Sequence, residues 1–315
     1  MMSPNVTLIA GDGEGPAIAA LVQEAVAAAG GKVSWEAADA ADPEAMIASI
    51  KANGVALKAK FMAAKPVGKV PYVIHLRKSL GIHTILRRCH NVPGLPARAQ
   101  GVDIMIVREA SEDIYAGFEH QTSEGVFETV KVTTRASCER ISRTAFEYAR
   151  KNGRKKVTTV HKSNILKKAD GMFLRVSQQI AAEYPDIQHD EVIVDALCMK
   201  LVRWPQDFDV LLCGNLFGDI VSDCAAGMAG GTTVATGVNL GDGVVMFENP
   251  HPSSSPYPML RLAVDLLDHL NPGPAARRLQ SAIEAALKQG VHSAEMGGKA
   301  GTADVRTALL SLLSA

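Results

Sequence analysis

Short apolar segments alternate with helix-forming segments along most of the 315 residues, and this alternation limits the possible folds more than any other feature. Residues 5–10 (NVTLIA) form a predicted strand that leads into the glycine-rich turn GDGEGP, and the alanine-rich residues 17–29 have apolar side chains at helical spacing. Two further predicted strands are residues 102–107 (VDIMIV) and 156–161 (KVTTVH). The pattern predicts an α/β fold with a largely parallel sheet as its core.

Composition and charge exclude several other classes. Hydrophobic residues make up 47% of the chain and charged residues 21%, which is typical of a globular protein and not of a disordered one. Lys+Arg and Asp+Glu both number 33, so no net charge draws the protein to nucleic acid or to an anionic membrane. We see no signal-peptide pattern, no apolar run of about 18 residues and no CxxC pair among the five cysteines. A cytoplasmic protein with reduced thiols is therefore expected, with no nucleic-acid or membrane partner.

An acidic pair is the first candidate for chemistry. Asp219 and Asp223 lie four residues apart in NLFGDIVSD, and a helix that opens at Asp219 would place both carboxylates on one side, one turn apart. With no basic residue between them they repel each other, and Mg²⁺ or Mn²⁺ would relieve that repulsion. Asp195, predicted to end the strand at residues 191–194, is a third candidate ligand. A solvated helix face, with Asp219 as a helix cap, is the alternative for the bare pair.

Basic and aromatic residues supply the second set of candidates. Arg77, Arg87 and Arg108 could bind carboxylates, since a guanidinium group matches a carboxylate with two parallel hydrogen bonds. Lys162 ends the strand 156–161 and could take a proton from a hydroxyl group, while Tyr115 could return one. Taken singly, each has an ordinary structural alternative: a surface arginine, a lysine that extends to solvent, or a core tyrosine.

Taken together, these motifs resemble one family in the right order. GDGEGP (11–16), the HLRK segment with Arg87, VREASEDIYAGFEH (107–120), VHKSNILKKADGMFL (160–174) and NLFGDIVSD (215–223) are similar to motifs of the isocitrate/isopropylmalate dehydrogenases, the β-decarboxylating hydroxyacid dehydrogenases. The resemblance implies that family's two-domain α/β fold, a parallel or mixed sheet flanked by helices. It also implies a discontinuous cofactor-side domain (1–82 and 230–315) and a central domain (83–229) with the metal signature and the dimer interface.

The resemblance also implies a role for each candidate residue. Tyr115 would protonate the enolate after CO₂ leaves, and Lys162 would serve the deprotonation of the hydroxyl group. Lys162 and Asp195 would come from a second subunit, which makes a homodimer the smallest active unit. The implied cofactors are Mg²⁺ or Mn²⁺ and NAD, less readily NADP. The full implied set is Arg77, Arg87 and Arg108 for substrate carboxylates, Asp195, Asp219 and Asp223 for the metal, and Asn215, His251 and Ser253 for the dinucleotide.

Three segments depart from the family pattern. Pro71 and Val73 replace a serine and an asparagine that touch the substrate, which predicts a substituent other than that of isocitrate. Lys65 stands in the stretch that approaches the nicotinamide. The cofactor loop is reduced to HPSSSPYPM (251–259) and lacks both the acidic residue that holds the NAD ribose and the basic residues that hold an NADP phosphate, unless Asp242 or Tyr257 compensates.

Three hypotheses follow from these departures. The first is an NAD-linked oxidative decarboxylase that acts on a 3-substituted malate. The second, which the shortened loop motivates, is a metal-dependent decarboxylase or enolising enzyme that has lost dinucleotide binding. The third is a non-catalytic partner subunit, and retention of the acid–base and metal residues ranks it last.

Overall fold

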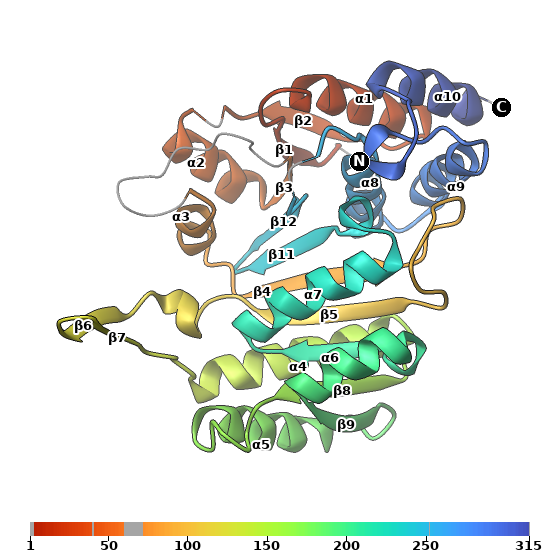
Figure 1. Ribbon diagram of the computed structural model, residues 1–315. Helices are drawn as coiled ribbons and strands as arrows, with labels where there is room; N and C mark the ends of the chain where they lie inside the picture. Colours follow the sequence, from red (N-terminus) through yellow and green to blue (C-terminus); the bar gives the residue numbers. More distant parts are fainter. Residues whose placement is uncertain (1–2, 40, 60–71, 252, 315) are drawn as a thin grey trace. The chain divides into compact units, whose positions relative to one another are not determined.

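The computed structural model describes residues 3–39, 41–59, 72–251 and 253–314, and the chain divides into two compact units (Figure 1). The first unit comprises Met1–Gly81, Asn91–Ala97 and Gly230–Ala315, and the second comprises Ile82–His90 and Arg98–Ala229. The assignment of a cofactor-side and a metal-bearing domain to the chain stays a prediction.

The first unit contains five strands in the order β2-β1-β3-β12-β11. All neighbours are parallel except the hairpin of β11 and β12. The strands are β1 (Asn5–Ile9), β2 (Ser34–Ala37), β3 (Val55–Lys58), β11 (Gly237–Gly241) and β12 (Val244–Glu248). The helices are α1 (Gly15–Ala28), α2 (Pro43–Asn53), α3 (Tyr72–Ser79), α8 (Tyr257–Leu270), α9 (Pro274–Lys288) and α10 (Thr302–Ser314), with short 3₁₀ turns η3 (Thr232–Val234) and η4 (Ala294–Met296).

The GDGEGP turn joins β1 to α1 as the sequence predicts. Gly11 and Gly13 have positive φ angles, which glycine adopts without strain. A Cβ atom at Gly15 would lie 2.0 Å from the carbonyl oxygen of Ala10, so only glycine fits there. Pro16 follows within the first turn of α1, where its missing N–H costs nothing.

The second unit also has five main strands, in the order β4-β5-β10-β8-β9, of which only β4 and β5 are antiparallel to each other. The strands are β4 (Thr84–His90), β5 (Asp103–Glu109), β8 (Lys156–His161), β9 (Gln188–Ile193) and β10 (Val210–Cys213). A separate hairpin is formed by β6 (Glu119–Ser123) and β7 (Val126–Thr129). The helices are α4 (Arg135–Lys151), α5 (Ala169–Ala181), α6 (Val194–Arg203) and α7 (Asn215–Ala229), with 3₁₀ turns η1 (Ile114–Ala116) and η2 (Pro205–Asp207).

Helices cover both faces of this sheet, and its central strands are therefore apolar on both sides. Helices α4 and α5 pack on one face, where Phe146 and Val176 meet Val107, Val157 and Leu212. Helices α6 and α7 lie on the opposite face (Figure 1). The β6–β7 hairpin extends away from the strands and leaves its side chains exposed.

The carboxyl ends of β5, β8 and β10 point to one edge of the sheet, because these three strands are parallel. Arg108 lies near the end of β5, Lys162 directly follows β8, and Asn215 begins α7 shortly after β10. Parallel α/β sheets place ligands at this edge. The topology of the second unit therefore brings three distant motifs to one region.

The fold class is confirmed, whereas two local predictions are wrong. Asp195 lies in the first turn of α6 and does not end a strand, because β9 stops at Ile193. Asp219 does not open a helix, since α7 already begins at Asn215 and Asp219 falls in its second turn. The one-turn spacing of Asp219 and Asp223 on a helix holds. Within the described ranges, no helix combines the length and apolarity that crossing a membrane requires.

Candidate functional site

The acidic pair on α7 is neutralised by two arginines from neighbouring strands. Arg87 on β4 contacts both acids, with Nη1 donating to Asp223 Oδ1 at 2.9 Å and Nη2 lying 3.6 Å from Asp219 Oδ1. Arg108 Nη1 donates to the same oxygen of Asp219. No basic residue stands between the two acids in the sequence, but the antiparallel β4–β5 pair supplies two cations from segments that are remote in sequence. Both carboxylates remain partly exposed, at 34% and 51% of their side-chain surface.

Arg108 is almost completely buried, at 1% exposure, and its guanidinium group bonds to two residues of α7. Its Nε and Nη2 both donate to Asn215 Oδ1, at 3.0 and 2.7 Å. The Asn215 amide in turn donates to the carbonyl oxygen of Glu112 at 3.0 Å. Asn215 therefore orients Arg108. A contact of Asn215 with a dinucleotide stays a prediction, and it would have to coexist with these hydrogen bonds.

Gly218 lets α7 approach Arg108 closely. A Cβ atom at Gly218 would lie 2.7 Å from Arg108 Cγ and 2.9 Å from its Cβ. These distances are too short for carbon atoms, so any side chain at residue 218 must displace Arg108.

The loop between Arg108 and Tyr115 is ordered by its own carboxylates. Glu109 accepts hydrogen bonds from the backbone of Ser111 at 2.7 Å and of Glu112 at 3.0 Å. Asp113 has φ 74°, and it is the one non-glycine residue with positive φ among the residues that the structure describes. Its ψ of −152° puts it in a region that costs free energy for any residue with a Cβ atom. Asp113 then caps the η1 turn by accepting from the Ile114 N–H at 2.8 Å.

Tyr115 lies on this turn and joins the cluster directly. Its hydroxyl group donates to Asp219 Oδ2 at 2.6 Å, and the Arg108 guanidinium lies 5.3 Å from the centre of its ring. Burial raises the pKa of Tyr115 above its ordinary value, and the Asp219 carboxylate raises it further. The phenol is thus kept in its protonated form, which a proton donor needs.

Lys162 and Asp195 form a pair of their own. Lys162 Nζ donates to Asp195 Oδ1 at 2.5 Å, and this bond lowers the pKa of the Asp195 carboxyl group. Asp195 is well exposed, at 68% of its side-chain surface. Among the described residues, no hydrogen bond or ion pair joins Lys162 or Asp195 to Tyr115 or Asp219.

The donor chemistry of α7 fits a hard divalent cation, but the donor set from one chain is incomplete. Asp219 and Asp223 offer carboxylate oxygens, which Mg²⁺ and Mn²⁺ prefer. Within the part of the chain that the structure describes, no group of three or more His, Cys, Asp and Glu side chains could hold a metal ion. Completion of the site by Asp195 of a second copy stays a prediction.

Arg77, the third predicted carboxylate-binding arginine, belongs to the first unit. Its Nη2 lies 3.4 Å from Glu248 Oε2, and its Nε is buried without a hydrogen-bond partner. Glu248 also accepts from Lys58 Nζ at 2.9 Å, in a pair that is almost fully buried. Lys58 and Glu248 stand in none of the motifs, and 190 residues separate them, so no local pattern could predict their pairing.

The shortened cofactor loop borders a pocket in the first unit. The free volume is about 190 Å³, and the lining includes Asp12, Glu14, Asn249 and Ser253–Ser255. Glu295 of η4 holds the loop, because it accepts hydrogen bonds from Ser253 Oγ and the Ser254 N–H, both at 2.6 Å. The predicted cofactor residue Ser253 thus lines this pocket.

Other residues near the loop have different surroundings. His251 is half-buried, and its backbone N–H donates to Asn249 Oδ1 at 3.3 Å. Tyr257 is fully buried and its hydroxyl donates to the Val291 carbonyl oxygen at 2.5 Å, so it does not replace the missing acidic residue. Asp242 lies in the turn between β11 and β12, beside Gly81. Lys65 and Pro71 lie outside the described residues.

The tie between Asp219 and Tyr115 makes a testable prediction. In metal-free protein, Asp219→Asn should lower the pKa of Tyr115, because removal of the negative charge makes the phenolate less unfavourable. Ultraviolet difference titration against Tyr115→Phe isolates this one tyrosine. Asp223→Asn is the matched control, since Asp223 contacts Arg87 and not Tyr115, and an equal shift in both variants would contradict the assignment.

Comparisons with known proteins identify the family to which this chain is similar. The sequence profile of the isocitrate/isopropylmalate dehydrogenase family matches residues 5–309. The chain is similar to the mitochondrial NAD isocitrate dehydrogenase regulatory subunit 2 of Arabidopsis thaliana, with 39% identity over 98% of this chain and 89% of the relative. It is also similar to catalytic subunit 6 of the same plant enzyme, with 36% identity over 96% and 87%. The crystal structure of isocitrate dehydrogenase from Methylococcus capsulatus matches with a TM-score of 0.90, 36% identity and full coverage of both chains.

The predicted cytoplasmic location is contradicted by these curated relatives, which are mitochondrial proteins. The prediction relied on reduced thiols and on the lack of a secretory signal or apolar span, and such features do not separate the cytoplasm from the interior of a mitochondrion.

The match over nearly the whole chain confirms the resemblance seen in the motifs. It also confirms that the protein is an oxidoreductase of the NAD-linked kind. The chain therefore belongs to the isocitrate/isopropylmalate dehydrogenase family and is an oxidative decarboxylating dehydrogenase.

Proposed function

We propose that the chain catalyses the metal-dependent, NAD-linked oxidative decarboxylation of a 3-substituted malate. The observation that carries the proposal is the cluster of Arg87, Arg108, Tyr115, Asp219 and Asp223 at the carboxyl edge of the second unit. It combines two cations for an organic acid, two oxygen ligands for a metal and one proton donor. The named relatives make isocitrate the first substrate to test, and the departures at Pro71 and Val73 extend the test to other 3-substituted malates.

The charges of the cluster support joint binding of metal and substrate. Arg87 and Arg108 balance Asp219 and Asp223, so these four charges sum to zero. A divalent cation on the two aspartates, completed by Asp195 of a second copy, would polarise the hydroxyl group and then the carbonyl group of the substrate. The arginines would then be released to bind substrate carboxylates.

Two residues supply the proton transfers. Lys162 would take the proton of the C2 hydroxyl group as a hydride leaves C2 for the dinucleotide. The C3 carboxyl group departs as CO₂, and its bonding electrons form the enolate. Tyr115 would then donate its proton to C3, a role for which its raised pKa suits it.

The pocket of the first unit supports NAD over NADP. Asp12, Glu14 and three serines line it, with no lysine or arginine among the described lining residues. Acidic and hydroxyl groups suit the free ribose hydroxyls of NAD, whereas a 2′-phosphate needs a basic partner. Because a pocket with hydroxyl and carboxylate groups remains beside the shortened loop, we favour an enzyme that still binds a dinucleotide over one that has lost this site.

A homodimer with shared sites accounts for the separation of Lys162 from Tyr115. The second unit exposes large apolar side chains, which a monomer rarely leaves in contact with water. They lie on the β6–β7 hairpin and its flanks and on α6 and α7: Phe118, Val126, Phe127, Val130, Met199, Val202 and Ile220. Burial of these residues against a second copy would bring its Lys162 and Asp195 to the cluster.

A second candidate is a partner subunit without activity of its own. It is favoured by one observation, the similarity to regulatory subunits of plant and Dictyostelium discoideum NAD isocitrate dehydrogenases. The complete set of acid–base and metal residues favours the catalytic function.

The direct test is formation of NADH by the metal-loaded protein with isocitrate, isopropylmalate and related acids. We expect NADH to form with at least one acid, to require Mg²⁺ or Mn²⁺, and to be far slower with NADP. Asp219→Asn should lower the rate about 100-fold or more, because one metal ligand is lost. A folded, metal-binding protein that forms no NADH with any of these acids would favour the partner subunit.

Gly218→Ala should damage the site without a comparable effect on the fold. The added Cβ displaces Arg108, and a shift of about 1 Å can cost about 10- to 100-fold in kcat/KM. Gly227→Ala on the same helix is the matched control, since its Cβ meets no atom within 4 Å. Steady-state kinetics and thermal melting measure both effects, and equal kinetics for the two variants would contradict the role of Arg108.

A shared site predicts complementation between inactive variants. Tyr115→Phe and Lys162→Met should each be inactive alone. In a shared-site dimer, co-refolding them gives mixed dimers with one intact site, so activity should return to about a quarter of the wild-type value. A site built from a single chain would give no recovery, and the measurement is the rate of NADH formation after mixing.

A further inference from the structure

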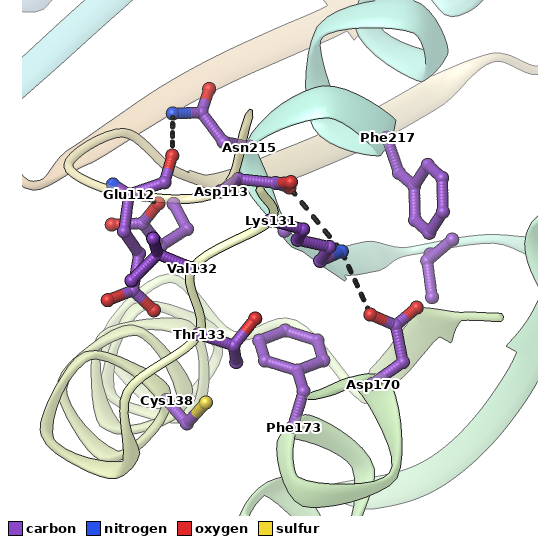
Figure 2. Close-up of a pocket in the computed structure, with 13 residues that line it drawn as sticks. Glu112, Asp113, Lys131, Val132, Thr133, Cys138, Asp170, Phe173, Asn215 and Phe217 are labelled. Carbon is purple, nitrogen blue, oxygen red and sulfur yellow. Dashed lines mark hydrogen bonds and ion pairs between the residues drawn. The ribbon is translucent and has the colours of Figure 1, made fainter. Parts of the chain in front are cut away.

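Lys131 lies between two buried carboxylates in the second unit (Figure 2). Its Nζ is 2.8 Å from Asp170 Oδ1 and 3.6 Å from Asp113 Oδ2. Both acids are nearly inaccessible, at 3% and 4% exposure. Lys131 is the one basic side chain that contacts either acid among the described residues. Burial of two carboxylates is unfavourable unless a cation balances them, so the arrangement depends on Lys131.

The surrounding cavity is too small to explain this arrangement as a ligand site. Its free volume is about 20 Å³, which admits one water molecule and no organic ligand. Lys131, Asp113, Asp170 and Phe217 line it, and Lys131 Nζ lies 5.0 Å from the centre of the Phe217 ring. We therefore expect Lys131, Asp113 and Asp170 to stabilise the local structure of the protein and not to bind an organic ligand.

Each carboxylate also accepts a backbone hydrogen bond at or beside a residue to which proton transfer is assigned: Asp170 at Lys162, and Asp113 next to Tyr115. The Asp170 Oδ2 atom accepts the backbone N–H of Lys162 at 2.7 Å, which fixes the start of the turn after β8. Asp113 caps the η1 turn of Tyr115 through the Ile114 N–H, and it also accepts the N–H of Leu216 in α7 at 3.2 Å. Lys131 thus links the turn of Tyr115 to the turn of Lys162 by one contact on each side.

The backbone of Asp113 explains why an ionic link is needed there. Its positive φ is unfavourable, so the turn keeps this shape only while its surroundings impose it. Hydrogen bonds with Val132, directly after Lys131, hold the Asp113 backbone at 3.0 and 3.4 Å. Residues 131 and 132 therefore hold both the backbone and the side chain of Asp113.

We infer that Lys131 is a positioning residue that sets the places of Tyr115 and Lys162 together, through Asp113 and Asp170. The inference rests on the proposed function in taking Tyr115 and Lys162 as the proton donor and acceptor. In a shared-site dimer, Tyr115 and Lys162 of one chain belong to different active sites. The contacts of Lys131 would therefore couple the geometry of the two sites.

The test measures both the local link and catalysis. NMR-detected exchange of the Lys162 and Ile114 amide hydrogens reports the two hydrogen bonds, with Val160 in β8 as the reference. Lys131→Met should speed exchange at both amides and leave Val160 unchanged. It should also lower kcat about 10- to 100-fold, with a much smaller change in KM. Lys131→Arg keeps the charge and should restore most of both properties, and Lys151→Met on the exposed end of α4 is the matched control.

The outcomes separate this inference from the proposed function. Unchanged exchange at both amides, an equal rise at Val160, or no rescue by Lys131→Arg would overturn the positioning role. Should Lys131→Met fail to fold, Asp170→Asn keeps an acceptor for the Lys162 amide and should speed exchange there alone; no change would again overturn the role. Wild-type protein that lacks dehydrogenase activity refutes the proposed function, whereas the exchange result still decides the link.

Discussion

The buried guanidinium group of Arg108 is the constraint on which the rest of the site depends. A charge at 1% exposure must have partners on every side, because an unpaired charge in the interior is strongly unfavourable. Asn215 and Asp219 on α7 provide those partners, and Gly218 allows the close approach. One interaction thus fixes α7 against β5. The Tyr115 turn follows, since its hydroxyl group bonds to the same Asp219.

The charge balance of this cluster has a chemical consequence. Two arginines and two aspartates cancel in the ligand-free protein, so neither a metal ion nor an organic acid alone meets a site of full opposite charge. Under the proposed function, binding of one would expose the countercharge for the other. Mutual dependence of this kind would favour the complete complex over either partial one.

The motif residues could be predicted from the sequence, whereas their partners could not. Arg108, Tyr115, Lys162 and Asp219 stand in short segments with a distinctive order, and strand ends in an α/β fold bring such segments together. Lys131 and Glu295 stand in no such motif, and their importance comes from contacts across 39 and 42 residues. The pairing of Asp219 with Arg87 and Arg108 could not be predicted for the same reason, because the arginines lie on strands remote from α7 in the sequence. Helix ends near Asp195 and Asn215 were misplaced by a few residues, as local patterns define boundaries poorly.

The two units differ in how closely they follow the family pattern, because the departures from it lie in the first unit. The second unit has the charged and acid–base residues that the resemblance implies, and Arg108 among them is nearly completely buried. The first unit has the altered cofactor loop, where Glu295 holds Ser253 and Ser254 in place of a longer segment. The Glu295 carboxylate gives the short loop a defined shape beside an acidic pocket. It accepts hydrogen bonds from the Ser253 hydroxyl group and the Ser254 N–H, which would otherwise bond to water. The strained Asp113 turn and the ion pairs of Lys131 lie beside the residues to which the proposed function assigns proton transfer. Under the proposed function, the free energy that this turn and the buried carboxylates cost is spent on the geometry of the site. The affinity of the first unit for NAD would then set how well that geometry is used.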